Sequence, residues 1–314
     1  MRRLRIARIA VRNEKERNLC KTMDFEKKAI ERIQIASEMS LHHYNAPLIC
    51  TYSGGKDSDV MLELFKRASV PFEVQHGLTT VDAPPTVRHI KSVFRSLEED
   101  GIKATIHKPD ISMWRLIQKK KIPPKRLTRY CCEVYKENIT PHRFVATGVR
   151  WAESQRRKNR QEIEPKEKKQ AEKLLLMNDN DRKRSLIETC KIKGDMIVNP
   201  IVDWPDSDIW DFYWSECPTH NTMYKNGYTR VGCVGCPMAS PKLRWKEFSD
   251  FPKYKDAYIR AFDRMLDAIH AGGKATRWKN GYDVFLWWME DQNVEGQISL
   301  EEFMQRKEPR LWPK

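Results

Sequence analysis

The sequence of 314 residues predicts an α/β protein with a doubly wound, mostly parallel sheet and a small helical appendage at its C-terminal end. Three observations lead to this prediction. Short apolar runs, which predict strands, alternate with segments of helical periodicity. One apolar run ends in a glycine-rich loop that leads directly into a helix. Hydrophobic residues make up 40% and charged residues 32% of the chain, which indicates a globular protein with a very polar surface.

The glycine-rich loop is the most informative stretch. It follows the apolar run Leu48-Ile49-Cys50-Thr51 and reads Ser53-Gly54-Gly55-Lys56-Asp57-Ser58. A strand, a loop and a helix N-terminus in that order aim backbone N–H groups and the positive end of the helix dipole at one point, which suits a phosphate. The glycines allow close approach of an anion, and the loop does not have the Walker A pattern. The alternative is a strand-to-helix turn without a ligand.

The remaining elements follow from periodicity along the chain. Pro84 and Pro85 fall where a helix begins, a position that tolerates proline. We expect strands over residues 71–76, 103–107, 143–150 and 196–201, and helices over residues 24–44, 87–97, 110–117 and 245–271 and from Asp206 onward.

The sequence divides into three predicted parts: a basic arm over residues 1–23, a nucleotide-binding α/β domain over residues 24–240, and a helical region over residues 241–314. The α/β domain carries a charge-dense insertion over residues 152–195. A solvated helix and loop is the default interpretation of such a run, and a surface that faces nucleic acid is the alternative.

The net charge of +15 favours a polyanionic partner, although a basic enzyme with anionic nucleotide substrates would also explain it. No run is long and apolar enough to span a bilayer, and the basic N-terminus is not followed by the apolar core of a signal peptide. We therefore expect a cytoplasmic protein without a membrane partner. Its eight cysteines are then free, catalytic or metal-bound rather than paired in disulfides.

Two cysteine pairs are candidate metal ligands. Cys233 and Cys236 form a C-x-x-C motif, and Cys131 and Cys132 are adjacent. Four thiolates suit a [4Fe–4S] cluster or a tetrahedral zinc ion. Adjacent ligands are awkward for zinc sites, which space their cysteines, so the pattern favours the cluster. Cys190 is a competing fourth ligand, and burial of the thiols without a metal is the alternative.

Two further segments carry candidate nucleotide ligands. Arg150 and Arg156 follow an expected strand, and guanidinium groups can bind phosphate oxygens in a bidentate manner. The alternative for these arginines is a solvated basic helix start. Asp82 lies in the turn after the second strand, where it could contact the nucleotide or a metal, or could simply be a turn aspartate.

Six segments resemble the phosphoadenosine phosphosulfate (PAPS) reductase family when they are taken together and in order. They are S-G-G-K-D-S, T-V-D-A-P-P-T, R-Y-C-C-E-V-Y-K, G-V-R-W-A-E-S-Q-R-R, N-P-I-V-D-W-P-D-S-D-I-W and Y-T-R-V-G-C-V-G-C-P, and the likeness covers residues 47–238. The loop resembles the PP-loop of ATP pyrophosphatases in the adenine nucleotide alpha-hydrolase-like superfamily. In that superfamily the loop holds the β- and γ-phosphates of ATP.

The resemblance implies a role for each matching residue. It makes Cys131, Cys132, Cys233 and Cys236 similar to the [4Fe–4S] ligands of the adenosine phosphosulfate reductase branch. It assigns the phosphate loop to Ser53, Gly54, Gly55, Asp57 and Ser58, and a nucleotide contact to Arg150. The residues themselves add Lys56, Asp82 and Arg156 to the predicted nucleotide-binding set. Of these residues, Lys56, Asp57 and Arg150 are expected to act in catalysis.

One departure from the family pattern favours ATP as the substrate. Assimilatory reductases attack the sulfonucleotide with a cysteine in an E-C-G-[LI]-H segment, and no cysteine follows Cys236 here. The resemblance then implies an ATP pyrophosphatase that uses Mg²⁺ and adenylates an acceptor for sulfur insertion, releasing pyrophosphate and AMP. A sulfonucleotide reductase and a nucleic-acid-binding module with a vestigial nucleotide site are the alternatives.

Among the pyrophosphatases, the sequence resembles the DNA phosphorothioation enzymes (Dnd or Ssp type) and the tRNA-thiolation enzymes. The resemblance therefore implies DNA or tRNA as the acceptor. It also implies a cysteine desulfurase or another sulfur donor, and other subunits of a modification complex, as partners.

Overall fold

The computed structural model describes residues 24–137, 139–166 and 195–289, and these fall into two compact units. The first unit contains the described residues up to 78 together with 84–108 and 139–231, and the second contains 79–83, 109–137 and those from 232 onward. The predicted basic arm, most of the charged insertion and the end of the predicted helical region lie outside the described residues.

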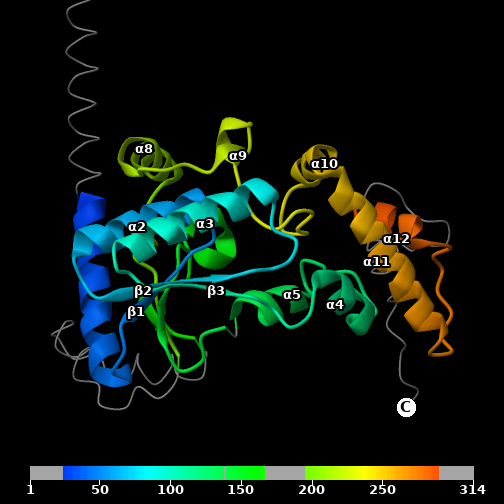
Figure 1. Ribbon diagram of the computed structural model, residues 1–314, viewed down its shortest axis with the longest axis horizontal. Coiled ribbons are helices and arrows are strands. Elements are labelled where there is room, and N and C mark those ends of the chain that lie inside the picture. The colour runs from blue at the N-terminus through cyan, green and yellow to red at the C-terminus, as the bar shows by residue number, and fades with distance from the viewer. Residues whose placement is uncertain (1–23, 138, 167–194, 290–314) are drawn as a thin grey trace, which may run out of the picture. The chain divides into compact units, whose positions relative to one another are not determined.

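The first unit contains a six-stranded sheet with the order β3-β2-β1-β4-β6-β5 (Figure 1). All neighbouring strands are parallel except β5, which pairs with β6 in the antiparallel direction. This arrangement confirms the predicted doubly wound, mostly parallel sheet. The strands are β1 (Leu48–Thr51), β2 (Phe72–Gly77), β3 (Ala104–His107), β4 (Phe144–Ala146), β5 (Ile163–Pro165) and β6 (Met196–Val198).

The strand order changes direction at the centre of the sheet. From β1 the chain adds β2 and β3 on one side, and it later adds β4 and β6 on the other, with Cys50 of β1 paired with Ala146 of β4. Open α/β sheets bind ligands at such a switch point, at the carboxyl ends of the strands. The residues that follow β1 and β4 are therefore placed to form a site.

The helices of the first unit complete its core. α2 (Lys56–Ala68) and α3 (Pro84–Glu99) run along the sheet (Figure 1). The helix over residues 24–44 contributes Ile33, which is fully buried together with Leu64 and Phe65 of α2. The two prolines occupy the first turn of α3, as predicted. The remaining helices are α8 (Asp206–Glu216), α9 (Thr222–Lys225) and the short 3-10 turns η2 (Trp151–Glu153) and η3 (Gln155–Arg157).

Two predictions about the strands need correction. The strand predicted over residues 143–150 is confined to β4, because the chain leaves the sheet at Thr147 to form the loop that carries Arg150. The charged insertion, predicted as helix and loop, contributes the edge strand β5. Charged neighbours hide its short pattern, and Pro165 suits an edge strand because it has no N–H to donate.

The second unit is mainly helical, which is consistent with a helical appendage. It also contains residues 79–83, 109–137 and 232–240, which the prediction placed in the α/β domain. The single helix predicted over residues 245–271 is two helices, because Pro252 cannot continue a helix and instead opens the second one. The helix predicted from Asp110 begins at Met113, with Ser112 at the N-cap position. The elements are α4 (Met113–Lys120), α5 (Tyr130–Cys132), the π-helical turn η1 (Glu133–Glu137), α10 (Pro241–Asp250), α11 (Pro252–His270) and α12 (Gly281–Trp288).

The core of the second unit is aromatic. Tyr258 and Phe262 of α11 pack on Trp288 of α12, with ring centroids 4.8 and 5.4 Å away. Within the described residues, no helix combines the length and the apolar character that crossing a bilayer requires.

Candidate active site

The loop after β1 requires glycine at two successive positions. Gly54 has a φ of +72°, and a Cβ atom there would lie 2.7 Å from Cγ1 of Ile90. Gly55 is the N-cap residue of α2, and its Cβ atom would lie 3.3 Å from the Tyr224 hydroxyl. A side chain at either position would therefore push the loop away from α3 or α9.

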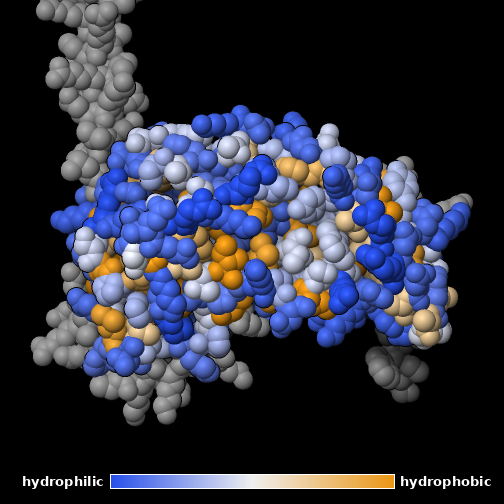
Figure 2. Space-filling view, in the orientation of Figure 1, coloured by the Kyte–Doolittle hydropathy of each residue, from blue (hydrophilic) through white to orange (hydrophobic). Residues whose placement is uncertain are grey.

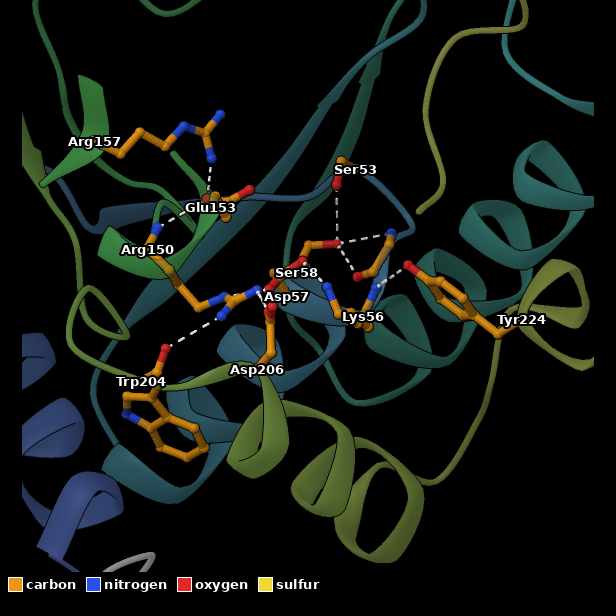
Figure 3. Close-up of polar contacts among 11 residues, drawn as sticks. Ser53, Lys56, Asp57, Ser58, Arg150, Glu153, Arg157, Trp204, Asp206 and Tyr224 are labelled. Carbon is orange, nitrogen blue, oxygen red and sulfur yellow. Dashed lines mark hydrogen bonds and ion pairs between the residues drawn. The ribbon is translucent and has the colours of Figure 1, made fainter. Parts of the chain in front are cut away.

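The two serines of the loop fix its shape. The Ser58 hydroxyl donates to the Gly55 carbonyl at 2.7 Å and accepts from the Gly55 N–H at 3.1 Å (Figure 3). Ser53 Oγ lies 3.2 Å from the same hydroxyl. These bonds close the loop over the first turn of α2, so its conformation is set before any ligand arrives.

Backbone donors remain available in this loop. Within the described residues, the N–H groups of Gly54 and Asp57 donate no hydrogen bond, and the N–H of Lys56 donates to the Tyr224 hydroxyl at 2.8 Å. The Gly54 carbonyl is bonded to the Asn221 side chain at 2.8 Å. The Gly54 carbonyl thus has a hydrogen-bond partner, and N–H groups remain available at the positive end of α2. This is the arrangement that binds phosphates.

Charged side chains surround these donors. Lys56 Nζ lies 2.9 Å from one carboxylate oxygen of Asp57 and 5.2 Å from the ring centroid of Trp210. The other oxygen of Asp57 accepts from Arg150 Nε at 2.6 Å. The lysine is only 8% exposed, so little water screens its charge from an anion in the loop.

Arg150 is engaged entirely with the protein. Its side chain is 1% exposed, and besides Asp57 it donates to Asp206 at 2.6 Å and to the Trp204 carbonyl at 3.2 Å (Figure 3). Burial lowers the pKa of Arg150, but the charges of Asp57 and Asp206 outweigh burial and leave the pKa raised. The structure therefore places this predicted nucleotide contact where it orients Asp57. The side chain of Arg156 lies outside what the structure describes.

The end of β4 approaches the loop closely. A Cβ atom on Gly148 would lie 3.4 Å from the main-chain carbon and oxygen of Asp57, so glycine lets the two loops meet. Thr147 donates to the Asn199 side chain at 2.5 Å and thereby ties the end of β4 to the residue after β6. The switch point of the sheet and the phosphate loop are thus one site.

A buried polar cluster lies under the loop. The Tyr52 hydroxyl donates to Asp59 and is 3.0 Å from Nε2 of His89, which lies 3.1 Å from both oxygens of Asp59. Burial raises the pKa of Asp59 above its ordinary value, while the hydrogen bond and charge of His89 lower it. The cluster joins the end of β1 to α2 and α3.

An apolar cavity of about 350 Å³ adjoins the loop within the first unit. Its wall includes Ile90, the residue that contacts the Gly54 position, so the cavity and the loop are neighbours. Hydrophobic side chains near β2 and β3 are visible in Figure 2. The lining residues are His76, Leu78, Val87, Ile90, Lys91, Ile106 and Lys108.

Sequence reasoning missed Tyr224, Asn221 and Asp206 as parts of this site. Each lies more than about 140 residues after the loop in the chain, and its role comes from packing rather than from a local pattern. The only sequence signal was the family resemblance. One of its segments, residues 199–210, contains Asp206, and another begins at residue 228, shortly after Tyr224.

The two predicted cysteine pairs both belong to the second unit. Cys131 and Cys132 end α5, and Cys233 and Cys236 occupy a turn in which the Cys236 N–H donates to the Cys233 carbonyl at 3.2 Å. The hydrogen bond with Cys132 raises the pKa of Cys131, as do burial and the charges of Cys233 and Cys236. The pairs are therefore close enough to sense each other's charge. Cys190, the competing ligand, lies outside the described residues.

The surroundings of these thiols combine a cation and aromatic rings. The charge of Cys233 is the main cause that raises the pKa of Lys136, although this lysine is exposed on the surface. Tyr258 is buried next to the same thiols. Among the described residues, no three His, Cys, Asp or Glu side chains are already grouped as ligands of one ion. By donor chemistry, four thiols fit an iron–sulfur cluster or zinc.

Asp82 also lies in the second unit. Its carboxylate accepts from the Thr79 N–H at 2.7 Å, and its backbone forms an isolated bridge with Cys233. In the structure it therefore acts as a turn aspartate, which was one of the two predicted roles, and its backbone supports a cysteine. Cys50 and Cys217 are buried in the first unit.

The match to a protein family decides the relationship. The phosphoadenosine phosphosulfate reductase domain matches residues 47–239. The chain belongs to this family. This confirms the predicted resemblance, and it does not distinguish DNA phosphorothioation enzymes from other members of the superfamily.

Two sequence relatives illustrate what the chain is similar to. An uncharacterized protein of Methanocaldococcus jannaschii is 26% identical over 255 residues, covering 79% of this chain and 53% of the relative. The chain thus spans about half the length of that relative. An adenosine 5'-phosphosulfate reductase of Geobacillus thermodenitrificans is 23% identical over 201 residues, covering 62% of this chain and 74% of that enzyme.

Two solved structures match the chain with low scores. A PAPS reductase from Candida auris is 16% identical, covers 68% of this chain and 93% of its own, and has a TM-score of 0.42. The U34-tRNA thiolase NcsA from Methanococcus maripaludis, solved with its [4Fe-4S] cluster, is 13% identical, covers 81% of both chains and has a TM-score of 0.33. Because these scores are low, the family assignment rests on the sequence match.

Proposed function

We propose that this member of the family is an ATP pyrophosphatase that adenylates an acceptor. The observation that carries the proposal is the preformed loop at the switch point of the sheet. It offers the unbonded N–H groups of Gly54 and Asp57 next to the buried Lys56. These donors suit the two phosphates that leave together as pyrophosphate, because the donors stabilise the negative charge that develops on the leaving phosphates.

The adenine base has a matching place in the apolar cavity beside the loop. The cavity of about 350 Å³ is large enough for a planar base and is lined mainly by aliphatic side chains. Ile90 lines the cavity and also lies next to Gly54. One nucleotide would therefore place its base in the cavity and its phosphates in the loop. The α-phosphorus would then lie between the two, open to attack by an acceptor oxygen.

The charged residues have different roles in the proposed reaction. Lys56 neutralises the departing pyrophosphate, and Arg150 holds Asp57 in one orientation toward it. Mg²⁺, which arrives with ATP and is held mainly by phosphate oxygens, would spread the remaining charge. Attack of the acceptor oxygen on the α-phosphorus forms the adenylate and breaks the bond to the β-phosphate. A sulfur nucleophile then displaces AMP.

The four cysteines complete the proposal. Cys131, Cys132, Cys233 and Cys236 would hold a [4Fe–4S] cluster, supported by their common place in one unit and by their mutual charge effects. A cluster of this kind can bind sulfur or stabilise the fold. Zinc is the other metal that this donor set accepts, and a metal analysis separates the two.

We propose nucleic acid as the acceptor, because the chain carries 58 Lys and Arg residues against 43 Asp and Glu residues. Such an excess favours binding to a polyanion. The sulfur would come from a cysteine desulfurase or a comparable donor, acting with other subunits of a modification complex. Release of pyrophosphate that increases with tRNA or DNA, and falls with added salt, would support this acceptor.

The test of the proposed reaction is a product analysis with Mg-ATP, tRNA or DNA as the acceptor and sulfide as the sulfur nucleophile. Wild-type protein should release AMP and pyrophosphate, and Lys56→Met should lower the rate by about 100-fold or more because the departing charge loses its cation. Lys66→Met, on the same helix and 3.6 Å from Asp100, should retain the rate. ADP and phosphate as products, or no turnover, would contradict the proposal. Sulfite formed from adenosine phosphosulfate would instead indicate a reductase.

A further inference from the structure

A tyrosine hydroxyl occupies the N-terminus of the phosphate-loop helix. Tyr224 belongs to α9, and its hydroxyl accepts from the N–H of Lys56, the first residue of α2, at 2.8 Å (Figure 3). The first N–H groups of a helix have no intrahelical partner, and in phosphate loops they bind a ligand oxygen. The Tyr224 hydroxyl therefore takes the place of a ligand oxygen at the Lys56 N–H, and a phosphate bound to the N–H groups of Gly54 and Asp57 in the same loop would lie beside it.

The position of this hydroxyl is fixed by the protein. Tyr224 is 8% exposed, and its ring packs edge-on against Trp210 at 5.0 Å and Tyr213 at 5.4 Å. Asn221 caps α9 by accepting from the Met223 N–H, and it donates to the Gly54 carbonyl. Asn221 thus connects the start of α9 to the loop, and the Tyr224 hydroxyl is held beside the loop.

The hydroxyl retains a proton for a further acceptor. A tyrosine hydroxyl can donate one hydrogen bond while it accepts another. Within the described residues, Tyr224 accepts from Lys56 but its O–H donates to no group. Burial raises the pKa of Tyr224 above its ordinary value, so the phenol keeps its proton at neutral pH. The available N–H groups of Gly54 and Asp57 belong to the same loop.

We propose that Tyr224 is a phosphate-binding residue whose hydroxyl accepts from the Lys56 N–H and donates to an oxygen of the anion in the loop. The hydroxyl thereby links the N–H at the N-terminus of α2 to the ligand through two successive hydrogen bonds. The inference rests on the proposed function only in that the loop binds a phosphate, and it does not require ATP cleavage. Loss of a hydrogen bond to a charged group should weaken binding by about 10-fold or more.

The experiment is calorimetric titration of the full chain with pyrophosphate. Tyr224→Phe keeps the ring and removes only the hydroxyl. Tyr213→Phe is the matched control, since Tyr213 is buried in the same aromatic group but its hydroxyl accepts from the Asn221 N–H at 2.8 Å rather than from the loop. We expect Tyr224→Phe to bind about 10-fold more weakly and Tyr213→Phe to bind within about 3-fold of the wild type. Thermal unfolding of each variant shows whether its fold is kept.

Three results would overturn the assignment: unchanged binding by Tyr224→Phe, tighter binding, or an equal loss in Tyr213→Phe. Tighter binding would mean that the hydroxyl competes with the anion, and an equal loss would mean that only packing matters. If the wild type binds pyrophosphate but does not release it from ATP, the proposed function fails while Tyr224 is still tested by the same titration. If the wild type binds no pyrophosphate, both fail.

Discussion

The phosphate loop and the cysteine region differ in how their functional groups are held. In the loop, hydrogen bonds from the protein hold the side chains and most of the backbone, although the N–H groups of Gly54 and Asp57 donate none within the described residues: Arg150 holds Asp57, Ser58 holds Gly55, and Tyr224 takes the Lys56 N–H. In the cysteine region Cys131 and Cys132 share a hydrogen bond, Cys233 lies 3.4 Å from the Thr79 hydroxyl, and the charge of Cys233 acts on Lys136. The difference indicates that the protein itself shapes the first site, and the proposed cluster would complete the second.

The largest expected effect concerns the cysteine region. Replacement of Cys233 and Cys236 together by serine should abolish bound iron, because two of four ligands are lost. Iron and sulfide analysis of anaerobically purified protein measures this. Cys217→Ser, at a buried thiol of the first unit, should leave the iron content unchanged. The comparison predicts that pyrophosphate binding survives the loss of iron, and a parallel loss of both would show that the sites are not independent.

The second effect concerns the buried charges of the loop. Arg150→Met leaves Asp57 without its main partner, and breaking a buried ion pair from one side costs about 3 kcal/mol. Arg157→Met removes an exposed pair with Glu153 and should cost less than about 1 kcal/mol. Urea denaturation measures both variants. Equal costs would show that Arg150 does not organise the site.

A smaller effect separates steric contact from backbone strain. Gly54→Ala places a methyl group 2.7 Å from Ile90 at a φ of +72°, whereas Gly101→Ala meets nothing within 4 Å at a φ of +76°. Strain at positive φ alone costs about 1 kcal/mol, so Gly101→Ala should lose about that much stability and Gly54→Ala about 2 kcal/mol or more. Thermal unfolding compares them. A smaller loss at Gly54 would mean that α3 does not confine the loop.

The smallest effect is a pH dependence of stability. Burial raises the pKa of Asp59 above its ordinary value of 3.8, while nearby His89 and His220 and the Tyr52 hydroxyl lower it, leaving the pKa raised. The folded state therefore holds this proton more tightly than the unfolded state. Stability from this group is present at low pH and is lost as the pH rises above about 4 through the folded pKa.

Asp59→Asn removes this titration. The free energy of unfolding of the wild type, minus that of Asp59→Asn, should therefore fall between pH 4 and pH 7. Urea denaturation at several pH values gives this difference. A difference that stays constant or increases with pH would show that Asp59 is stabilised as a carboxylate by its neighbours.

The part of the site that lies in one local stretch could be predicted from the sequence. The apolar strand, the two glycines and the helix that follows all lie within about 20 residues, so their pattern fixed strand, loop and helix N-terminus correctly. The arrangement of Arg150 could not be predicted in the same way. Its residue type indicated a phosphate contact, but its partner Asp206 lies 56 residues away and only packing shows that the guanidinium is already bound.

The limits in the second unit have a different cause. The C-x-x-C spacing indicates a ligand pair. That Cys131 and Cys233, about 100 residues apart, lie in one unit and affect each other's charge follows from the fold and not from spacing. The break between α10 and α11 was missed because the apolar pattern continues through Phe251, although Pro252 marks the new helix.

The most direct test of the proposed reaction uses one anaerobic preparation of the full chain. It is given either Mg-ATP with tRNA or DNA and sulfide, or adenosine phosphosulfate with a dithiol reductant, and all products are measured. The account predicts AMP and pyrophosphate from ATP, with no sulfite from adenosine phosphosulfate. Sulfite and AMP from adenosine phosphosulfate, with ATP left intact, would contradict it and make the loop the binding site of a reductase.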